Sequence, residues 1–382
     1  MRRILSIVAL GAALAGCALG PDYRRPDLPT PSAWRDADTQ ADPASLADLS
    51  WWQLFRDEEL QGLVRIALEE NKDLRIAVTR VDQARAMAGI TRSAEFPRVD
   101  AGASATTNRA SDTVHPRDMG GEQGLLATTV DLGFEIDIWG RLRRASEAAR
   151  AELLASEDAQ HAVAMTLVGD VAAAYLQLRE LDLELAITRR NVESRRQSVQ
   201  IVRERFEAGL TSALDLRQAE AELASTAAQI PDLERQVAQT ENQLSLLLGR
   251  NPGGITRGRP LTGQTFPPAV PAGLPSALLE HRPDIRQAEA ALAAANARIG
   301  VAKAAFFPQI SLTGFFGVES AALSDLFTGP SRIWRFGPSV TLPIFDAGRN
   351  QANLEFTEAQ QREALHRYEQ AIQQAFREVE DA

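Results

Sequence analysis

Two segments of this chain repeat one another, and this internal duplication constrains the fold more than any other feature of its 382 residues. The spacing between matching residues is constant apart from one short gap. Three matches carry the repeat: Leu68–Arg75 with Leu279–Arg286, Phe96-Pro97 with Phe307-Pro308, and Gly140-Arg141 with Gly348-Arg349. Such repeats predict one structural unit built twice. We therefore expect the elements of the first copy to recur in the second.

The repeats set the expected domain boundaries. The first copy is expected over residues 57–249 and the second over residues 274–382, joined by a Gly- and Pro-rich linker over residues 250–273. The first copy continues well beyond Ala174, whereas the second stops at the matching residue, Ala382. Two interpretations are open here: the chain is a truncated fragment, or the duplication was always partial.

Each copy contains two runs in which apolar and polar residues alternate, which is typical of strands with two different faces. Each run is about 10 residues long, the length that a tilted strand needs to cross a membrane. Asp131, Glu135 and Asp137 fall opposite the apolar residues of their run, so we expect them to face a water-filled lumen. The runs occupy residues 98–108 and 126–138 in the first copy, and 309–318 and 333–346 in the second.

Two ordinary hairpins of a soluble sheet are the alternative interpretation of these runs. The loops inside the hairpins, over residues 109–124 and 319–332, are long, whereas soluble hairpins favour loops of about two to five residues. Trp139 and Trp334 also lie at strand ends, where membrane strands carry interfacial aromatic residues. Both observations favour strands that cross a membrane.

Four strands are too few to close a barrel, since about eight is the smallest number that does so. An open sheet edge cannot lie in lipid, because its N–H and C=O groups would remain unpaired. Several chains must therefore share one barrel, and two, three or four copies would give eight, twelve or sixteen strands.

Long helices flank the hairpins. A helix is expected over residues 57–95, a helical hairpin over residues 143–248, and another helix from residue 349. Apolar residues recur every seven positions on both sides of a tight turn at residues 208–212, which predicts an antiparallel coiled coil. Pro231 should kink the returning helix.

The N-terminus predicts export and lipid attachment. Two arginines and a short apolar run over residues 1–16 form a signal peptide, because the run is too short to span a bilayer. Cys17, the only cysteine, follows Leu14-Ala15-Gly16 and resembles the acceptor of a bacterial lipoprotein signal. We expect diacylglycerol and an N-acyl chain on Cys17 as the only attached groups, followed by an extended segment over residues 17–56; a chance cysteine is the alternative.

The composition disfavours several classes of function. The formal net charge of −10 argues against nucleic-acid binding, which needs cationic surface. A single cysteine excludes a Cys-cluster zinc site, and none of the four histidines has an acidic or Cys partner at the spacing of metal ligands. We expect no catalytic residues, no metal and no enzymatic activity. The four histidines are His115, His161, His281 and His366.

Taken together, the chain resembles the outer-membrane efflux protein family of TolC and OprM type, and its lipoprotein branch in particular. The resemblance covers the whole chain. It is carried by CALGPDYRRPDLPTP from Cys17, Trp51-Trp52, FEIDIWGR from Phe134, RFEAGLTS from Arg205, HRPDI from His281, and LPIFDAG from Leu342.

This resemblance implies an α+β membrane protein that forms a homotrimer. Three chains would build a 12-stranded transmembrane β-barrel in the outer membrane, continued by a long periplasmic α-helical coiled-coil barrel. The expected function is a passive duct for small molecules, docked to a periplasmic adaptor and an inner-membrane pump of the RND type. An adaptor-docking tip is implied at Arg205, Gly209, Leu210, Thr211 and Ser212. A lipid-anchored adaptor is the alternative, disfavoured by the tandem repeat and the four strands.

Overall fold

The computed structural model of the chain describes residues 18–29, 57–110, 121–264 and 278–381. These residues divide into two compact units, and the long central helix contributes to both. The first unit holds residues 18–29, 81–110, 121–156 and 285–374, and the second holds residues 57–80, 157–264, 278–284 and 375–381. Cys17 lies outside the described residues.

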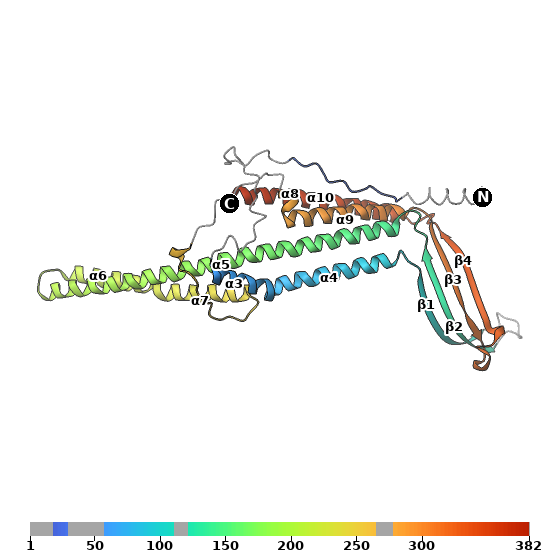
Figure 1. The fold of residues 1–382 in the computed structure, drawn as a ribbon, viewed down its shortest axis with the longest axis horizontal. Helices are drawn as coiled ribbons and strands as arrows, with labels where there is room; N and C mark the ends of the chain where they lie inside the picture. The colour runs from blue at the N-terminus through green and yellow to red at the C-terminus, as the bar shows by residue number, and fades with distance from the viewer. Residues whose placement is uncertain (1–17, 30–56, 111–120, 265–277, 382) are drawn as a thin grey trace. The chain divides into compact units, whose positions relative to one another are not determined.

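A four-stranded antiparallel sheet dominates one end of the first unit (Figure 1). Its strands lie in chain order, so each strand pairs with the one that follows it in sequence. The strands are β1 (Arg98–Ala110), β2 (Gly121–Glu135), β3 (Gln309–Ser320) and β4 (Arg332–Thr341).

All four predicted strands are present, but several of their predicted bounds were wrong. β2 begins at Gly121 rather than at residue 126, because residues 121–125 pair with the end of β1. β2 ends at Glu135 rather than at residue 138, because the chain turns tightly there and the Ile138 N–H donates to the Ile136 carbonyl. β4 ends at Thr341 rather than at residue 346, because Thr341 pairs with Gln309, the first residue of β3. Within the described chain, β4 has no strand to pair with beyond that point.

The helix expected over residues 57–95 is two helices, α3 (Glu58–Glu70) and α4 (Lys72–Ser93). Asn71 separates them. Its side-chain oxygen accepts a hydrogen bond from the Leu74 N–H, which caps α4, and its amide nitrogen donates to the Leu247 carbonyl. The break therefore depends on a residue far away in sequence.

The predicted helical hairpin is formed by α5 (Arg141–Glu207), α6 (Ala213–Ala227) and α7 (Gln229–Leu247). The returning helix breaks at Ala228, three residues before Pro231, because proline lacks an N–H and its ring clashes with the carbonyl four residues earlier. Ion pairs join the two antiparallel arms: Arg189 with Glu234, Arg195 with Glu222, and Arg203 with Glu220.

The second repeat supplies α8 (Leu278–His281), α9 (Pro283–Ala304) and α10 (Arg349–Asp381). Short 3₁₀ turns lie at Leu261–Gly263, Leu323–Asp325 and Gly329–Ser331. In α9 the buried side chains are mostly small, and they include Ala294, Ala295 and Ala297.

The second unit has its own apolar core, built from α3, the start of α4, the middle of α5 and the end of α7. One stretch of α5 is apolar and long enough to cross a membrane by length and composition. A core helix meets the same criterion, and α5 places Val171, Tyr175 and Leu178 fully inside this core.

Candidate channel wall and docking tip

The strand register gives the sheet one polar and one apolar face. Directly opposed residues of antiparallel strands share a face, so Asp100, Asp131, Phe315 and Arg335 form one row across all four strands. The apolar face instead carries exposed large side chains, among them Val99, Val130, Phe316, Trp334, Phe336 and Val340.

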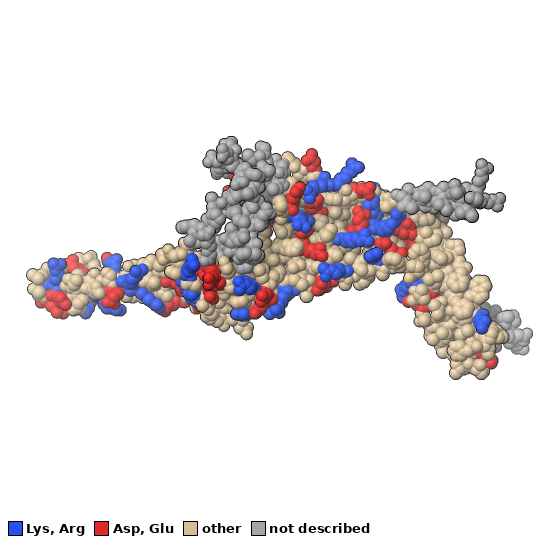
Figure 2. Space-filling view, viewed as in Figure 1, with Lys and Arg blue, Asp and Glu red and all other residues tan. Residues whose placement is uncertain are grey.

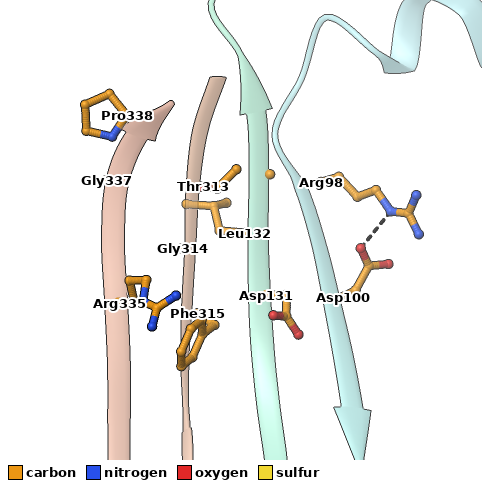
Figure 3. A pocket seen from close by; sticks show the side chains of 11 residues that line it. Arg98, Asp100, Asp131, Leu132, Thr313, Gly314, Phe315, Arg335, Gly337 and Pro338 are labelled. Atoms are coloured by element: carbon orange, nitrogen blue, oxygen red, sulfur yellow. Dashed lines mark ion pairs between the residues drawn. The ribbon is translucent and has the colours of Figure 1, made fainter. Parts of the chain in front are cut away.

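A shallow hollow of about 540 Å³ lies on the polar face, around the row that contains Asp131 (Figure 3). Arg98 forms an ion pair with Asp100 at 2.7 Å, and the Thr129 hydroxyl donates to the Asp131 carboxylate at 2.8 Å. The Arg335 guanidinium lies over the Phe315 ring, 5.6 Å from its centroid. The sequence drew attention to the acidic residues alone, but this face carries both signs of charge.

Two further acidic residues predicted to face the lumen lie where the strands meet the helices. Glu135, the last residue of β2, shares the polar face with Asp131 and forms a two-bond ion pair with Arg141, at 2.6 and 2.9 Å. This hydrogen-bonded pairing raises the pKa of Arg141 above its usual range. Asp137 lies beyond the end of β2, and its carboxylate accepts a hydrogen bond from the Arg143 N–H at 3.0 Å.

An aromatic cluster marks the same junction. The Trp139 indole N–H donates to the Pro308 carbonyl at 2.8 Å, and its ring lies 4.8 Å from that of Phe307. Interfacial aromatic residues are expected where a membrane strand leaves the bilayer. On the face seen in Figure 2, charged residues cover the helices, whereas the strands carry few of them.

The segment that follows the predicted lipid site at Cys17 is held against α5 by Arg144. The Arg144 side chain is only 6% exposed and donates to the carbonyls of Leu19 and Gly20, at 3.1 and 3.4 Å. It also forms an ion pair with Asp22 at 2.7 Å. One buried guanidinium therefore binds three residues of this segment, Leu19, Gly20 and Asp22.

The later residues of this segment contact α9. The Asn296 amide donates to the Pro21 carbonyl, and Arg25 makes two hydrogen bonds of 2.6 and 2.7 Å to Glu289. The Tyr23 hydroxyl donates to Glu289 as well, and burial together with the nearby Glu289 charge raises the pKa of Tyr23. We call residues 18–25 the strap.

The predicted docking tip is an ordered turn between α5 and α6. Gly209 adopts a left-handed conformation with φ of +72°, and its N–H donates to the Phe206 carbonyl. The Leu210 N–H donates to the Arg205 carbonyl, which completes the Schellman motif that ends α5. Leu210 is 76% exposed, so the turn presents an apolar side chain on a rigid frame.

Three hydrogen bonds converge on the Asp215 carboxylate at the start of α6. One Asp215 oxygen accepts from the Thr211 hydroxyl at 2.6 Å, from the Ser212 hydroxyl at 2.7 Å and from the Ser212 N–H at 3.0 Å. These bonds favour the ionised form and lower the pKa of Asp215. The structure thus gives Thr211 and Ser212 a structural role as well as the predicted docking role.

A buried polar cluster holds the described part of the predicted linker, residues 250–264. The Asp57 carboxylate, which is almost fully buried, accepts hydrogen bonds from Tyr175 at 3.2 Å and from Gln264 at 2.7 Å. Burial acts to raise the pKa of Asp57, but hydrogen bonds from Gln264, from the Glu59 N–H and from Tyr175 lower it overall. The Tyr175 oxygen also accepts from the Gly258 N–H at 2.9 Å.

Sequence reasoning missed Arg144, Arg335 and Asp57 as site residues. The alternation of β4 could have identified Arg335, because it is polar in a run with apolar neighbours. The local sequence could have identified Asp57 as the N-cap of α3, but its bonds to Tyr175 and Gln264, like those of Arg144 to Leu19, Gly20 and Asp22, join residues far apart in sequence. Among the described residues, no group of three or more His, Cys, Asp or Glu is placed to hold a metal ion.

The chain is similar to known proteins over most of its length. A family model described as outer membrane efflux protein matches residues 63–250 and 274–382. The chain is 40% identical to a probable efflux pump outer membrane protein, SepC, of Pseudomonas putida (strain F1), over 98% of this chain and 80% of that protein. It is 38% identical to a probable outer membrane lipoprotein, SilC, of Salmonella typhimurium, over 96% of this chain and 79% of that protein.

Solved structures agree with the sequence comparison. The open state of the MtrE outer membrane channel of Neisseria gonorrhoeae superposes with a TM-score of 0.85 at 34% identity. The match covers 96% of this chain and 81% of that channel.

Proposed function

Because the chain belongs to the outer membrane efflux protein family, we propose that three copies of it close one transmembrane β-barrel and dock through their helical-hairpin tips to a periplasmic adaptor. The membership confirms the predicted family, the predicted fold class and the predicted place in the outer membrane. The chain is an outer-membrane channel component of an efflux system.

The proposal of a trimer depends on one observation: the sheet has a polar face, an apolar face and two free edges. Within the described residues, β1 and β4 each have a strand on one side only. Lipid tolerates neither free edge, since unpaired N–H and C=O groups are costly in hydrocarbon. Copies that join edge to edge satisfy these groups, and they place the polar face around water and the apolar face against lipid. Three copies give the twelve strands that the resemblance implies.

The polar face supports a passive duct. Asp100, Asp131, Arg335 and their neighbours offer charges and hydroxyl groups to water, and the row contains no arrangement suited to covalent chemistry. Transport then needs only an open aqueous path, and an inner-membrane pump of the RND type supplies the energy. The pump and not the duct selects the cargo.

The tip supports adaptor docking. Leu210 is exposed on a turn whose backbone is fixed by the Schellman motif and by the Asp215 hydrogen bonds. A rigid frame loses little entropy on binding, which favours recognition by another helical hairpin. Arg205, Gly209, Leu210, Thr211 and Ser212 form the proposed contact surface.

A lipid on Cys17 would fix the chain to the inner leaflet of the outer membrane. The strap begins directly after this residue, and the Leu19 N–H donates to the Trp139 carbonyl at the junction of strand and helix. An acyl chain placed there would enter the bilayer at the level of the interfacial aromatic residues. Labelled palmitate should enter the wild type and not Cys17→Ser; entry into the variant would contradict the proposal.

Purified lipidated protein tests the channel itself. We expect a particle of three chain masses in detergent, and an ohmic conductance without any energy source after insertion into planar bilayers. A monomer that stays soluble without detergent, with no conductance, would overturn the proposal.

A further inference from the structure

The two β-hairpins have the same strand register, residue for residue. Arg98 pairs with Gly133 in the first hairpin, and their counterparts in the repeat, Gln309 and Thr341, pair in the second. The sequence matches that flank the hairpins set this correspondence, because Phe307-Pro308 aligns with Phe96-Pro97 and Gly348-Arg349 aligns with Gly140-Arg141. The repeat therefore extends from the sequence to the pairing of the strands: residues that correspond in the two copies are paired in the same way.

The same rule applies to the joint between hairpins. β2 and β3 join the two hairpins within a chain, and Asp131 lies opposite Phe315. The repeat counterpart of β2 is β4, and the counterpart of β3 is β1. The free edges of β4 and β1 can therefore pair with each other as β2 and β3 do, when they belong to two different copies of the chain.

We infer that β4 of one copy pairs with β1 of the next copy with Ser339 directly opposite Ser104. These residues are the repeat counterparts of Asp131 and Phe315, respectively. The inference rests on the proposed assembly of several copies into one barrel, and it adds the register of the seam between them. The occupant of each free edge is a second copy of this chain.

The faces of the strands agree with this register. Ser339 and Ser104 both lie on the polar face, and the adjacent pair, Val340 with Ala103, lies on the apolar face. A slip of one residue would place the apolar side chains of one copy beside the polar side chains of the next. The seam inferred from the repeat keeps both faces continuous, although the faces were not used to derive it.

Backbone directions agree as well. The Ile136 N–H donates to the Ile310 carbonyl at 2.8 Å, and backbone groups on antiparallel strands point to alternate sides. The repeat counterparts are Ile344 and Val99, so the Ile344 N–H would donate to the Val99 carbonyl of the next copy. By the same alternation, the nitrogen of Pro338 faces the free edge, where a proline removes no hydrogen bond within the chain.

The inferred seam covers side chains that the single chain leaves bare. Ile344 is 95% exposed and Phe345 is 88% exposed, just beyond the end of β4. In the seam, Ile344 lies opposite Val99, which is itself 64% exposed. The residues between 342 and 346, predicted as strand but irregular here, gain a partner strand only in the next copy.

The register also sets the slope of the strands. The polar row that runs from Asp100 through Asp131, Phe315 and Arg335 continues in the next copy at Asn108 and not at Asp100. A row that climbs along the strand in each copy requires strands that are strongly tilted relative to the barrel axis.

Disulfide cross-linking tests the seam in the full lipidated protein. Ser104→Cys combined with Ser339→Cys places two thiols at a pair that is not hydrogen-bonded, about 4.5 Å apart between Cα atoms, which suits a disulfide. Oxidation in outer-membrane vesicles should yield covalent dimers and trimers on non-reducing gels. Ser104→Cys with Gly337→Cys, or with Thr341→Cys, shifts the pair by two residues on the same face and should react about tenfold more slowly.

Gly133→Cys with Thr313→Cys is the matched control, because these residues are opposed within one chain and should cross-link without a change in mass. Faster cross-linking of either shifted pair would overturn the inferred register. So would the absence of any cross-link between copies in a preparation that is trimeric by mass and in which the control pair oxidises. A preparation that is monomeric by mass would instead overturn the proposed assembly.

Discussion

Ser212 and Asp215 cap one another at the start of α6. The Asp215 N–H donates to the Ser212 hydroxyl at 3.3 Å, and the Asp215 carboxylate accepts from the Ser212 N–H at 3.0 Å. Ser212 lies three residues after Gly209, the left-handed glycine that follows the end of α5 at Glu207. The turn at the tip is therefore fixed on both sides, and its order can be tested by removing one side at a time.

Ser212→Ala should loosen the first turn of α6. Loss of an N-cap hydroxyl costs about 1 kcal/mol. Hydrogen exchange of the amides at the start of α6 should become roughly fivefold faster, in line with that cost. Ser198→Ala, in the interior of α5, is the control and should leave exchange at the tip unchanged. Equal exchange at the tip in wild type and Ser212→Ala would contradict a structural role for this hydroxyl.

The order of the tip should depend on acid pH through Asp215. Hydrogen bonds lower the pKa of this carboxyl in the folded chain, so the unfolded segment takes up the proton first as the pH falls. The stabilisation is complete above the ordinary aspartate pKa of about 3.9 and is lost as the pH falls through the lowered value. The difference in exchange between wild type and Asp215→Asn should therefore be large at pH 6 and small near pH 2. A constant difference would be inconsistent with this account.

Gly249 and Gly209 form a matched pair. Each ends a helix in a Schellman motif with φ of +72°. A Cβ at Gly249 would overlap the Glu70 carbonyl, whereas a Cβ at Gly209 would have no neighbour within 4 Å. Both alanine variants pay about 1 kcal/mol for the left-handed backbone, and Gly249→Ala should lose a further 1–3 kcal/mol through displacement of α3. Urea-induced loss of helical circular dichroism measures the difference, and equal losses would refute the role of the Glu70 contact.

The gap between predicted and observed elements has a physical cause in each case. Alternation and heptads sufficed for the strands and for the helical hairpin, because both patterns are local. The break at Asn71 was missed because its amide binds the Leu247 carbonyl, which only the folded chain brings near. The end of β4 was missed because strand pairing requires a neighbour, and β3 begins opposite Thr341.

The site residues also divide into those that a local sequence pattern predicts and those that depend on distant contacts. Asp131 and Glu135 lie on the polar face as their alternation predicted, whereas Asp137 lies past the strand. Whether these residues face a lumen stays a prediction until the barrel is assembled. Arg144 resembles any charged residue of a helix in sequence, and only the return of the strap to α5 gives it a role.

Arg144→Met should release the strap. The substitution keeps most of the apolar stem but removes the donors to Leu19, Gly20 and Asp22, at an expected cost of about 1–3 kcal/mol. Trypsin should then cleave after Arg24 severalfold faster than in the wild type, whereas the bond after Arg25 is protected by Pro26. Arg196→Met, which removes an exposed pair with Glu193 on α5, is the control. Unchanged cleavage in Arg144→Met would show that other contacts hold the strap.

Leu210→Asp should impair coupling to the adaptor without disrupting the trimer. A charge at the centre of an apolar contact loses its hydration on docking, so adaptor binding should weaken by tenfold or more. Leu210→Met keeps the apolar surface and serves as the control. Drug susceptibility of a strain that depends on this channel, together with the trimer fraction in its membranes, gives the readout. Full resistance with Leu210→Asp would contradict the docking assignment.

The shared register makes the two hairpins equivalent units of the wall. A single hairpin presents the same two edges as the whole sheet, so six hairpins would close a ring of the same size as three chains. A chain that carries both hairpins halves the number of molecules that must meet to close that ring. The two units still differ in chemistry, because Glu135 has an arginine partner whereas its repeat counterpart is Pro343.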